Sequence, residues 1–144
     1  QAGTLGKIIK LIEMPDNTIT AIIQGVRRFD VGQIDITAPY MMARVSYRAD
    51  IVPADKDKDM EAVASSIKDA AMHIVKLTPH MPAEAGFAIK NIEDYNFLVN
   101  FVASSIEIDT LNDKLPLLRI DSLYERSLKL LEILFVKENL VLVV

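Results

Sequence analysis

The sequence contains no cysteine, and only five of its 144 residues are glycines. Without cysteine the chain can form no disulfide, no thiolate nucleophile and no cysteine-ligated zinc site. The glycines fit neither G-x-x-x-x-G-K-[ST] nor G-x-G-x-x-G, the patterns in which backbone amides converge on phosphates. We therefore predict no cofactor for this chain. The five are Gly3, Gly6, Gly25, Gly32 and Gly86.

A basic surface and a long apolar run are missing too. The net charge is −4, and acidic and basic side chains alternate over residues 55–59, so that their charges cancel locally. A protein that grips nucleic acid needs clustered Lys and Arg, and a membrane span needs about 18–20 apolar residues in a row. We therefore expect neither a nucleic-acid nor a membrane partner. Residues 1–4 and the aliphatic run 140–144 are atypical of natural termini, so we expect both ends to be cuts in a longer protein.

Side chains capable of chemistry are few and poorly grouped. Neither His73 nor His80 has a second histidine three or four residues away, the spacing used by helical metal sites. The serine pairs at 65–66 and 104–105 lack the G-x-S-x-G turn that exposes a nucleophile. Ser127 precedes a lysine by two positions, which aims the two side chains apart on a helix. We expect helix-surface serines, a surface or half-buried His73, and no catalytic or metal-binding residue.

Strand patterns fill the first third of the chain. Two aliphatic segments at residues 5–14 and 18–24 flank the turn residues Pro15-Asp16-Asn17, which predicts a β-hairpin. In the second segment, Ile19, Ala21 and Ile23 alternate against Thr18, Thr20 and Ile22. Gly25 predicts a bulge or bend. Further strands are expected at residues 31–36 and at residues 40–52, where alternation predicts one buried and one wet face.

From Pro53 onward the apolar residues recur with helical spacing. Residues 55–77 carry three aspartates near their start, which favours a helix N-terminus there. The apolar stripe of this helix is Met60, Val63, Ala64, Ile67, Ala71 and Ile74. We expect a short helix at residues 83–88, a third capped by Asp94, and a short fourth capped by Asn112 or Asp113. Asp121 is expected to cap a long last helix with an apolar stripe of Tyr124, Leu128, Leu131 and Phe135.

Strands followed by helices, without β-α-β alternation, predict an α+β fold rather than a parallel sheet. We expect an N-terminal antiparallel β-sheet subdomain over residues 1–53. A C-terminal helical bundle over residues 54–144 is expected to end in the long helix.

The order of the motifs resembles the N-terminal domain of ATP-dependent Lon proteases. The family's G-T motif is similar to Ala2-Gly3-Thr4-Leu5, and its P-D-G-T turn is similar to Pro15-Asp16-Asn17-Thr18. Its G-x-x-R motif is similar to Gly25-Val26-Arg27-Arg28, and aliphatic strands separate the three motifs. In the helical half, the family's P-x-E turn resembles Met81-Pro82-Ala83-Glu84. Its I-x-D helix start resembles Ile92-Glu93-Asp94. The chain departs from the family in three respects: Asn17 replaces glycine in the turn, the family's opening strand is absent, and Pro116 is unusual in its helix.

This resemblance implies a substrate-recognition and assembly domain that binds unfolded or tagged proteins and has no activity of its own. The parent protein, of which we expect the chain to be part, would be a homo-oligomeric ring, commonly a hexamer, of the bacterial cytoplasm. It would be an ATP-dependent serine endopeptidase with an AAA+ ATPase that uses ATP and Mg²⁺, and it would degrade damaged, misfolded and regulatory proteins.

Recognition of unfolded protein requires exposed apolar surface or an open strand edge. Our candidates are the hairpin around residues 14–17, where Met14 is expected to be exposed beside the turn, and the run that contains Phe29, Tyr40, Met41 and Met42, although each also suits a core position. Two other functions stay open. One is a stand-alone interaction module similar to cereblon-type proteins, without a protease. The other is a small enzyme of unrecognised type, for which the sequence offers no nucleophile and base.

Overall fold

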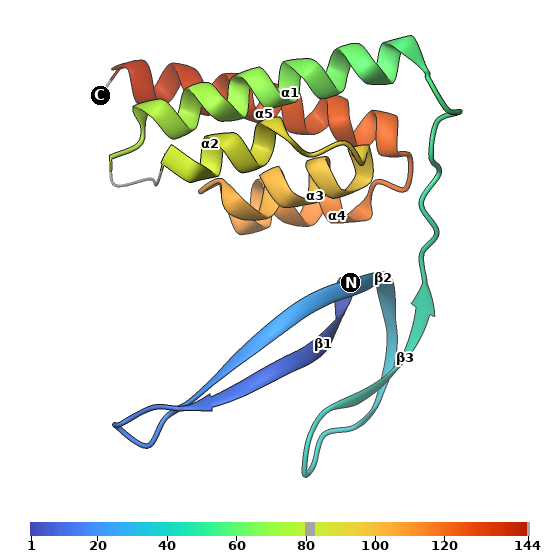
Figure 1. The fold of residues 1–144 in the computed structure, drawn as a ribbon. Helices are drawn as coiled ribbons and strands as arrows, with labels where there is room; N and C mark the ends of the chain where they lie inside the picture. The colour runs from blue at the N-terminus through green and yellow to red at the C-terminus, as the bar shows by residue number, and fades with distance from the viewer. Residues whose placement is uncertain (80–82, 144) are drawn as a thin grey trace. The chain divides into compact units, whose positions relative to one another are not determined.

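The computed structural model describes residues 1–79 and 83–143, which form two compact units, Gln1–Ala49 and Asp50–Val144. The first unit holds the strands and the second holds the helices (Figure 1). The predicted α+β class, with an antiparallel sheet before a helical bundle that ends in a long helix, is confirmed. We call the two parts the sheet unit and the helical unit.

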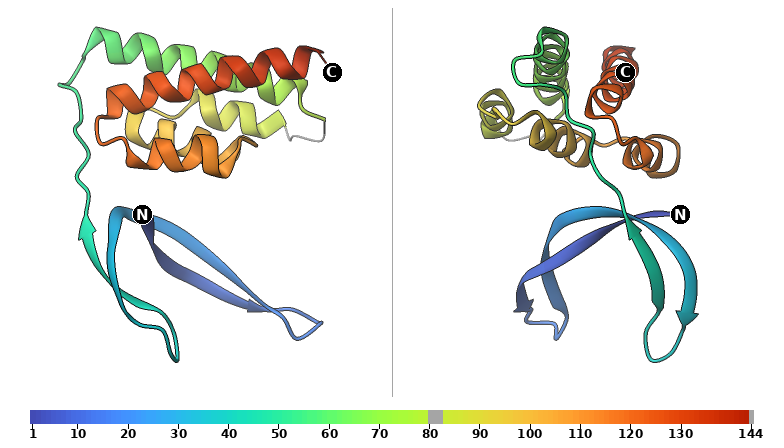
Figure 2. Two further views of the ribbon diagram at one scale, coloured as in Figure 1. Left: turned by 180° about the vertical axis from the view of Figure 1, so that it is seen from behind. Right: turned by 90° about the vertical axis from the view of Figure 1, so that its right-hand side faces the viewer.

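The sheet unit is a three-stranded antiparallel meander in the order β1-β2-β3. Its strands are β1 (Ala2–Glu13), β2 (Ile19–Ile36) and β3 (Met42–Tyr47). The long β2 strand bends midway, so that one half pairs with β1 and the other with β3, and two hairpin arms extend from the bend (Figures 1 and 2). The hairpin predicted around residues 15–17 is confirmed.

Irregular pairing accounts for the bend in β2. The register shifts between Leu5 and Gly6 of β1, where Val26 is the extra residue of β2, and it shifts again between Val31 and Ile34. An extra residue in one strand bends that strand and raises its twist. The bulge predicted at Gly25 is confirmed. The prediction of separate strands at 18–24 and 31–36 is wrong, because the intervening residues keep their pairing with β1.

The third strand is shorter than the sequence predicts. It ends at Tyr47, whereas the alternating pattern extended the strand to residue 52. The backbone of Ile51 pairs instead inside the helical unit: its N–H donates to the carbonyl of Asp121 at 2.9 Å, and its carbonyl accepts from Leu123 at 2.9 Å. Residues 50–53 therefore begin the helical unit.

The helical unit contains α1 (Lys58–Leu77), α2 (Ala83–Lys90), α3 (Tyr95–Ser105), a π-helical turn (Thr110–Lys114), α4 (Leu115–Arg119) and α5 (Leu123–Val143). Two predicted helix starts are confirmed. Asp57 caps α1 by accepting from the N–H of Met60 at 2.9 Å, and Asp94 caps α3 by accepting from Phe97 at 2.6 Å. The apolar stripe predicted for α1 lies in the core, where Ile67 and Ala71 are fully buried.

Two later helix predictions are wrong. Asp109, rather than Asn112 or Asp113, caps the turn before α4, since its carboxylate accepts from the N–H of Asn112 at 2.7 Å. At the start of α5, the Ser122 hydroxyl accepts from the Glu125 N–H at 3.3 Å, so Ser122 takes the role predicted for Asp121.

The predicted stripe of α5 is wrong at two of its four residues, whereas the other two, Tyr124 and Leu131, are partly buried against the core. Leu128 and Phe135 are exposed, and the buried stripe lies one position away, at Leu123, Ser127, Leu130 and Leu134. Ser127 is buried rather than on the helix surface because its hydroxyl donates to the Leu123 carbonyl at 2.7 Å.

A buried arginine ties the start of the helical unit to α5. Arg126 is only 2% exposed, and its guanidinium forms an ion pair with Asp50. It also donates to the Ile120 carbonyl at 3.0 and 2.8 Å. A buried charge is tolerated when it is paired and hydrogen-bonded. Arg126 therefore fastens residues 50–53 to the helices beside them.

Candidate functional site

The sheet unit exposes its apolar side chains. None of residues 1–49 is buried, although both strands of the first hairpin arm are rich in Ile and Leu. Monomeric proteins rarely expose large contiguous apolar patches, and such patches often mark interaction sites. This arm therefore warrants a residue-by-residue description.

The strand register separates the arm into two unlike faces. Ile8 lies opposite Ile23, and Leu11 lies opposite Ala21, so these four residues share a face with Ile19, which lies two positions before Ala21 at the start of β2. We call Ile8, Leu11, Ile19, Ala21 and Ile23 the hairpin face. Ile19 and Ile23 are 69% and 61% exposed.

The reverse side of the same arm is mixed. There Lys7 lies opposite Gln24, Lys10 opposite Ile22, and Ile12 opposite Thr20. Its two isoleucines, Ile12 and Ile22, are 37% and 46% exposed, less than those of the hairpin face. The hairpin face is thus apolar apart from Glu13, which lies opposite Ile19, and the reverse side is partly polar.

Met14 lies at the turn that closes this arm. Its N–H donates to the Thr18 carbonyl at 2.8 Å, and its carbonyl accepts from the Asn17 N–H at 3.0 Å. Asn17 has a positive φ of 64°, which asparagine tolerates well in place of glycine. The side chain of Met14 is 41% exposed.

Asp16 stabilises the turn next to Met14. Its carboxylate accepts from the Thr18 hydroxyl at 2.6 Å and from the Thr18 N–H at 3.0 Å. The side-chain hydrogen bond, and after it the backbone one, lowers the pKa of Asp16 below its usual 3.8. These bonds fix the turn through a side chain and need no buried core.

Phe29 lies at the bend of β2, between Gly3 of β1 and Tyr47 of β3. It is half-buried because its ring lies against Gly3, where an added Cβ would come within 2.8 Å of a ring carbon. Polar contacts surround the bend: Arg48 pairs with Asp30 at 2.7 Å. Phe29 therefore packs within the sheet and offers less free surface than the other candidates.

Tyr40, Met41 and Met42 lie at the tip of the second arm, after a cis Ala38–Pro39 peptide bond. Tyr40 and Met41 are 67% and 69% exposed. Met42 lies opposite Ile36 and begins β3. All three side chains are available to a ligand.

The structure does not gather the five candidates into one site. Tyr40, Met41 and Met42 are neighbours at one tip, Met14 lies at the other tip, and Phe29 lies at the bend between the arms (Figures 1 and 2). The hairpin around residues 14–17 was a candidate, but the strand residues that form the hairpin face were not named. The signal was present in the alternation of Ile19, Ala21 and Ile23, whose exposure the sequence could not reveal.

The side chains considered for chemistry have structural partners. His73 of α1 pairs through Nδ1 with Glu138 of α5, and its side chain is part-exposed as predicted. The Ser66 hydroxyl donates to the Ala62 carbonyl at 3.0 Å, and that of Ser104 to the Phe101 carbonyl at 2.9 Å. His80 lies outside the described residues.

The described residues offer neither a metal-binding cluster nor a membrane-spanning helix. Within residues 1–79 and 83–143, no three His, Cys, Asp or Glu side chains are grouped so as to hold a metal ion. No helix in the described part of the chain has the length and apolar character that crossing a membrane requires.

Comparison with protein families gives a match over almost the whole chain. The model described as the ATP-dependent protease La (LON) substrate-binding domain matches residues 1–135. The Lon protease of Flavobacterium johnsoniae is 39% identical over 129 residues, which cover 90% of this chain and 16% of that protein. The Lon protease of Cytophaga hutchinsonii is 40% identical over 134 residues, which cover 93% of this chain and 16% of that protein. The chain thus spans about a sixth of the length of these relatives.

A solved structure has the same fold. The N-terminal domain of Mycobacterium avium complex Lon protease superimposes with a TM-score of 0.71 and 16% sequence identity. The match covers 93% of this chain and 69% of that one.

Proposed function

Because the chain belongs to the family of substrate-binding domains of ATP-dependent protease La (Lon), we propose that it binds unfolded or tagged proteins for degradation. The observation that carries this proposal is the family match over residues 1–135. The exposed apolar surface of the sheet unit supports it, since an unfolded chain offers apolar side chains that a folded one hides. The relatives are named as proteases, and this chain spans about a sixth of their length.

The proposal extends to the parent protein. It would be an ATP-dependent serine endopeptidase that uses ATP and Mg²⁺ outside this chain, assembles as a homo-oligomeric ring, commonly a hexamer, and works in the bacterial cytoplasm. The identity of about 40% to bacterial Lon proteases supports this assignment. In such a ring each copy of the chain would contribute one binding surface, and several weak contacts would add up through multivalency.

Within the chain we assign binding to the hairpin face with Met14, and to the tip at Tyr40, Met41 and Met42. Both regions expose large apolar side chains. Phe29 contributes less, because Gly3 and its strand neighbours already cover part of its ring. Burial of apolar surface is non-directional, which suits a domain that must accept many sequences.

The test is a titration of the purified chain against a fluorescently labelled, permanently unfolded protein, followed by anisotropy. The same labelled protein in its folded form is the control. Saturable binding of the unfolded form alone is expected. Equal binding of both forms, or none at high concentration of the chain, would count against substrate recognition by this chain.

A pair of variants tests the surface itself. Ile19→Thr with Ile23→Thr removes apolar area from the hairpin face and keeps a β-branched side chain in each strand position. We expect binding to weaken by about tenfold or more, on the basis of about 1 kcal/mol lost per residue. The matched control is Ile22→Thr, on the reverse side of the same strand, which should leave binding within about twofold of the original.

A further inference from the structure

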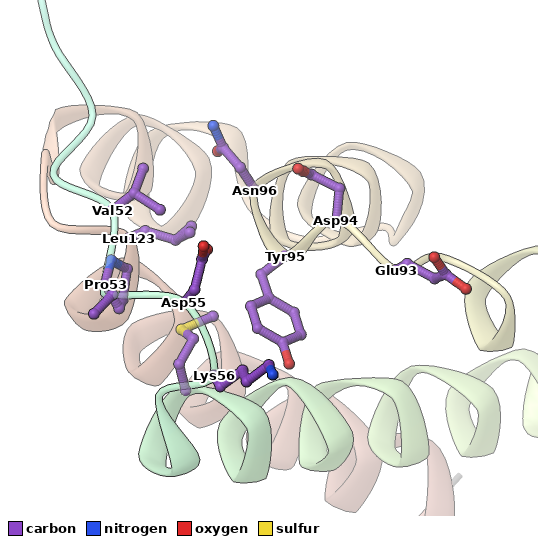
Figure 3. Close-up of a pocket in the computed structure, with 11 residues that line it drawn as sticks. Val52, Pro53, Asp55, Lys56, Glu93, Asp94, Tyr95, Asn96 and Leu123 are labelled. Atoms are coloured by element: carbon purple, nitrogen blue, oxygen red, sulfur yellow. The ribbon is translucent and has the colours of Figure 1, made fainter.

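A pocket lies at one end of the helical unit, far in sequence from the hairpin face. Its volume is about 400 Å³, within the usual range for ligand sites. Four parts of the chain line it: residues 52–56 before α1, Met60 in α1, residues 93–96 at the start of α3, and Leu123 at the start of α5 (Figure 3). Such a site cannot be seen in the sequence, because its walls come from separate stretches of the chain.

The contacts already described hold the walls of this pocket in place. The Arg126–Asp50 ion pair and the two backbone hydrogen bonds of Ile51 fasten the segment before α1 to the start of α5. Asp57 and Asp94 fix the first turns of α1 and α3. The pocket is therefore preformed, and a ligand need not order its walls on binding.

One part of the pocket is apolar and aromatic. Val52, Pro53 and Leu123 form one wall, and the Tyr95 ring stands opposite them, with the Asp55 carboxylate between (Figure 3). Tyr95 is half-buried, so one part of its ring stays available to a ligand. An aliphatic stem fits between such walls, and an aromatic ring also attracts a cation.

The charge of the pocket is negative. Three carboxylates, those of Asp55, Glu93 and Asp94, line it against the single ammonium of Lys56, which leaves a net charge of −2. Asp94 is engaged as the cap of α3. Within the described part of the chain, the carboxylates of Asp55 and Glu93 have no hydrogen bond and no ion pair. Two acidic groups are therefore free to receive a donor.

We propose that this pocket binds the side chain of a lysine or arginine presented by a protein ligand. The aliphatic stem lies against Val52 and Pro53, the cation reaches Asp55, and Glu93 at the rim adds attraction. Charge-assisted hydrogen bonds to a carboxylate are stronger than neutral ones. The proposal rests on the proposed function only in that the ligand is a protein segment, and it adds that substrates carrying basic residues beside apolar ones are preferred.

Two other ligand classes fit these observations less well. An anion would suit bare helix N-termini, but Asp57 and Asp94 already occupy the starts of α1 and α3. A metal ion requires converging ligands, and in the described residues no group of three acidic or histidine side chains is close enough. A basic side chain needs only one or two carboxylates and an apolar wall.

The test uses NMR of the whole 144-residue chain titrated with N-acetyl-arginine amide. The matched probe is N-acetyl-citrulline amide, which has the same shape without the charge. Backbone amides of Asp55, Glu93 and Tyr95 are expected to shift with the arginine probe. Binding of the citrulline probe should be weaker by about fivefold or more, the ratio that corresponds to the loss of one favourable charge contact.

Variants assign the effect to the pocket. Asp55→Asn with Glu93→Gln should weaken arginine binding by about fivefold and abolish the preference over citrulline. Glu107→Gln, beyond the other end of α3, also removes a negative charge. It should leave the affinity for the arginine probe and the preference over citrulline unchanged. Unaltered shifts elsewhere in the spectrum of the double variant show that it is folded. Equal binding of the two probes, or shifts that lie outside the pocket, would overturn the proposal.

A second experiment distinguishes this proposal from the proposed function. The unfolded protein of the anisotropy titration is compared before and after acetylation of its lysines, which removes their charge. If acetylation lowers the affinity of the unfolded protein for the original chain but not for the double variant, the pocket is supported as part of substrate binding. If the arginine probe binds while the unfolded protein does not, the pocket stands and substrate recognition fails. If the unfolded protein binds equally with and without acetylation, the role of the pocket in substrate binding is overturned while substrate recognition stands.

Discussion

The helical unit and the sheet unit differ in where they put their apolar side chains. In the helical unit, α1, α3 and α5 bury a continuous set that includes Ile67, Leu98 and Leu134, each less than 2% exposed. In the sheet unit no residue is buried, and the hairpin face is left open. Burial of apolar surface stabilises a fold only where it occurs. The open hairpin face thus belongs to the unit in which no residue is buried, and the core lies in the other unit.

The largest test of this contrast deletes the same side chain in both units. Leu134→Ala removes a fully buried leucine, and we expect a loss of about 3 kcal/mol in the free energy of unfolding, from lost burial and the cavity left behind. Leu11→Ala removes an exposed leucine from the hairpin face, and its effect should stay near 0.5 kcal/mol or below, roughly the level of a surface substitution. Urea unfolding followed by circular dichroism measures both. Equal losses would show that the sheet unit has a core after all.

The second test breaks the attachment of residues 50–53. Arg126→Met removes the guanidinium from its buried position, and we expect a loss of about 2 kcal/mol. The expected loss in the free energy of unfolding is smaller than for breaking a fully buried ion pair, because the side chain of the partner Asp50 is 30% exposed and can be hydrated. Lys129→Met is the control, since its pairing with Glu132 is on the surface and worth little. Similar unfolding free energies for the two variants would contradict the anchoring role of Arg126.

A smaller effect is expected at a helix cap. Asp94→Ala removes the acceptor of the Phe97 N–H, which should cost about 1 kcal/mol. The conservative variant Asp94→Ser keeps a capping oxygen and should recover most of that loss. Thermal unfolding of the two variants provides the comparison. If both are equally destabilised, the carboxylate acts through something other than capping.

The smallest effect concerns the turn of the sheet unit. The lowered pKa of Asp16 means that the unfolded chain holds this proton more tightly than the folded chain does. The stabilising contribution is complete above the unfolded value of 3.8, and it is lost as the pH falls through the lower folded value. An NMR titration should place the pKa of Asp16 below 3.8, and Thr18→Val should move it back toward that value. No change in Thr18→Val would mean that the hydroxyl is not the cause.

Periodicity predicted those parts of the fold in which polarity and burial agree. The α1 stripe, the first hairpin and the cap at Asp94 are of this kind. The α5 stripe was misplaced because two polar residues, Arg126 and Ser127, are buried through contacts that the sequence does not show. The break expected in β2 was wrong because pairing with β1 carries the strand through the bend.

The candidate site was less predictable than the fold. Met14, Tyr40, Met41 and Met42 were named as apolar residues near turns, and all four are exposed. Their spacing along the chain said nothing about the two separate tips they occupy. The pocket at Asp55 and Tyr95 was missed because its walls meet only after α1, α3 and α5 have packed.

The most direct test of the central claim, that the sheet unit carries the substrate surface and the helical unit the core, is methyl NMR of isoleucine. The chain is observed with and without a saturating, permanently unfolded protein. We predict that the δ1 methyl signals of Ile19 and Ile23 shift or broaden. The signal of Ile67, buried in α1, should stay unchanged. Unchanged signals from Ile19 and Ile23 while the ligand is bound would contradict the account.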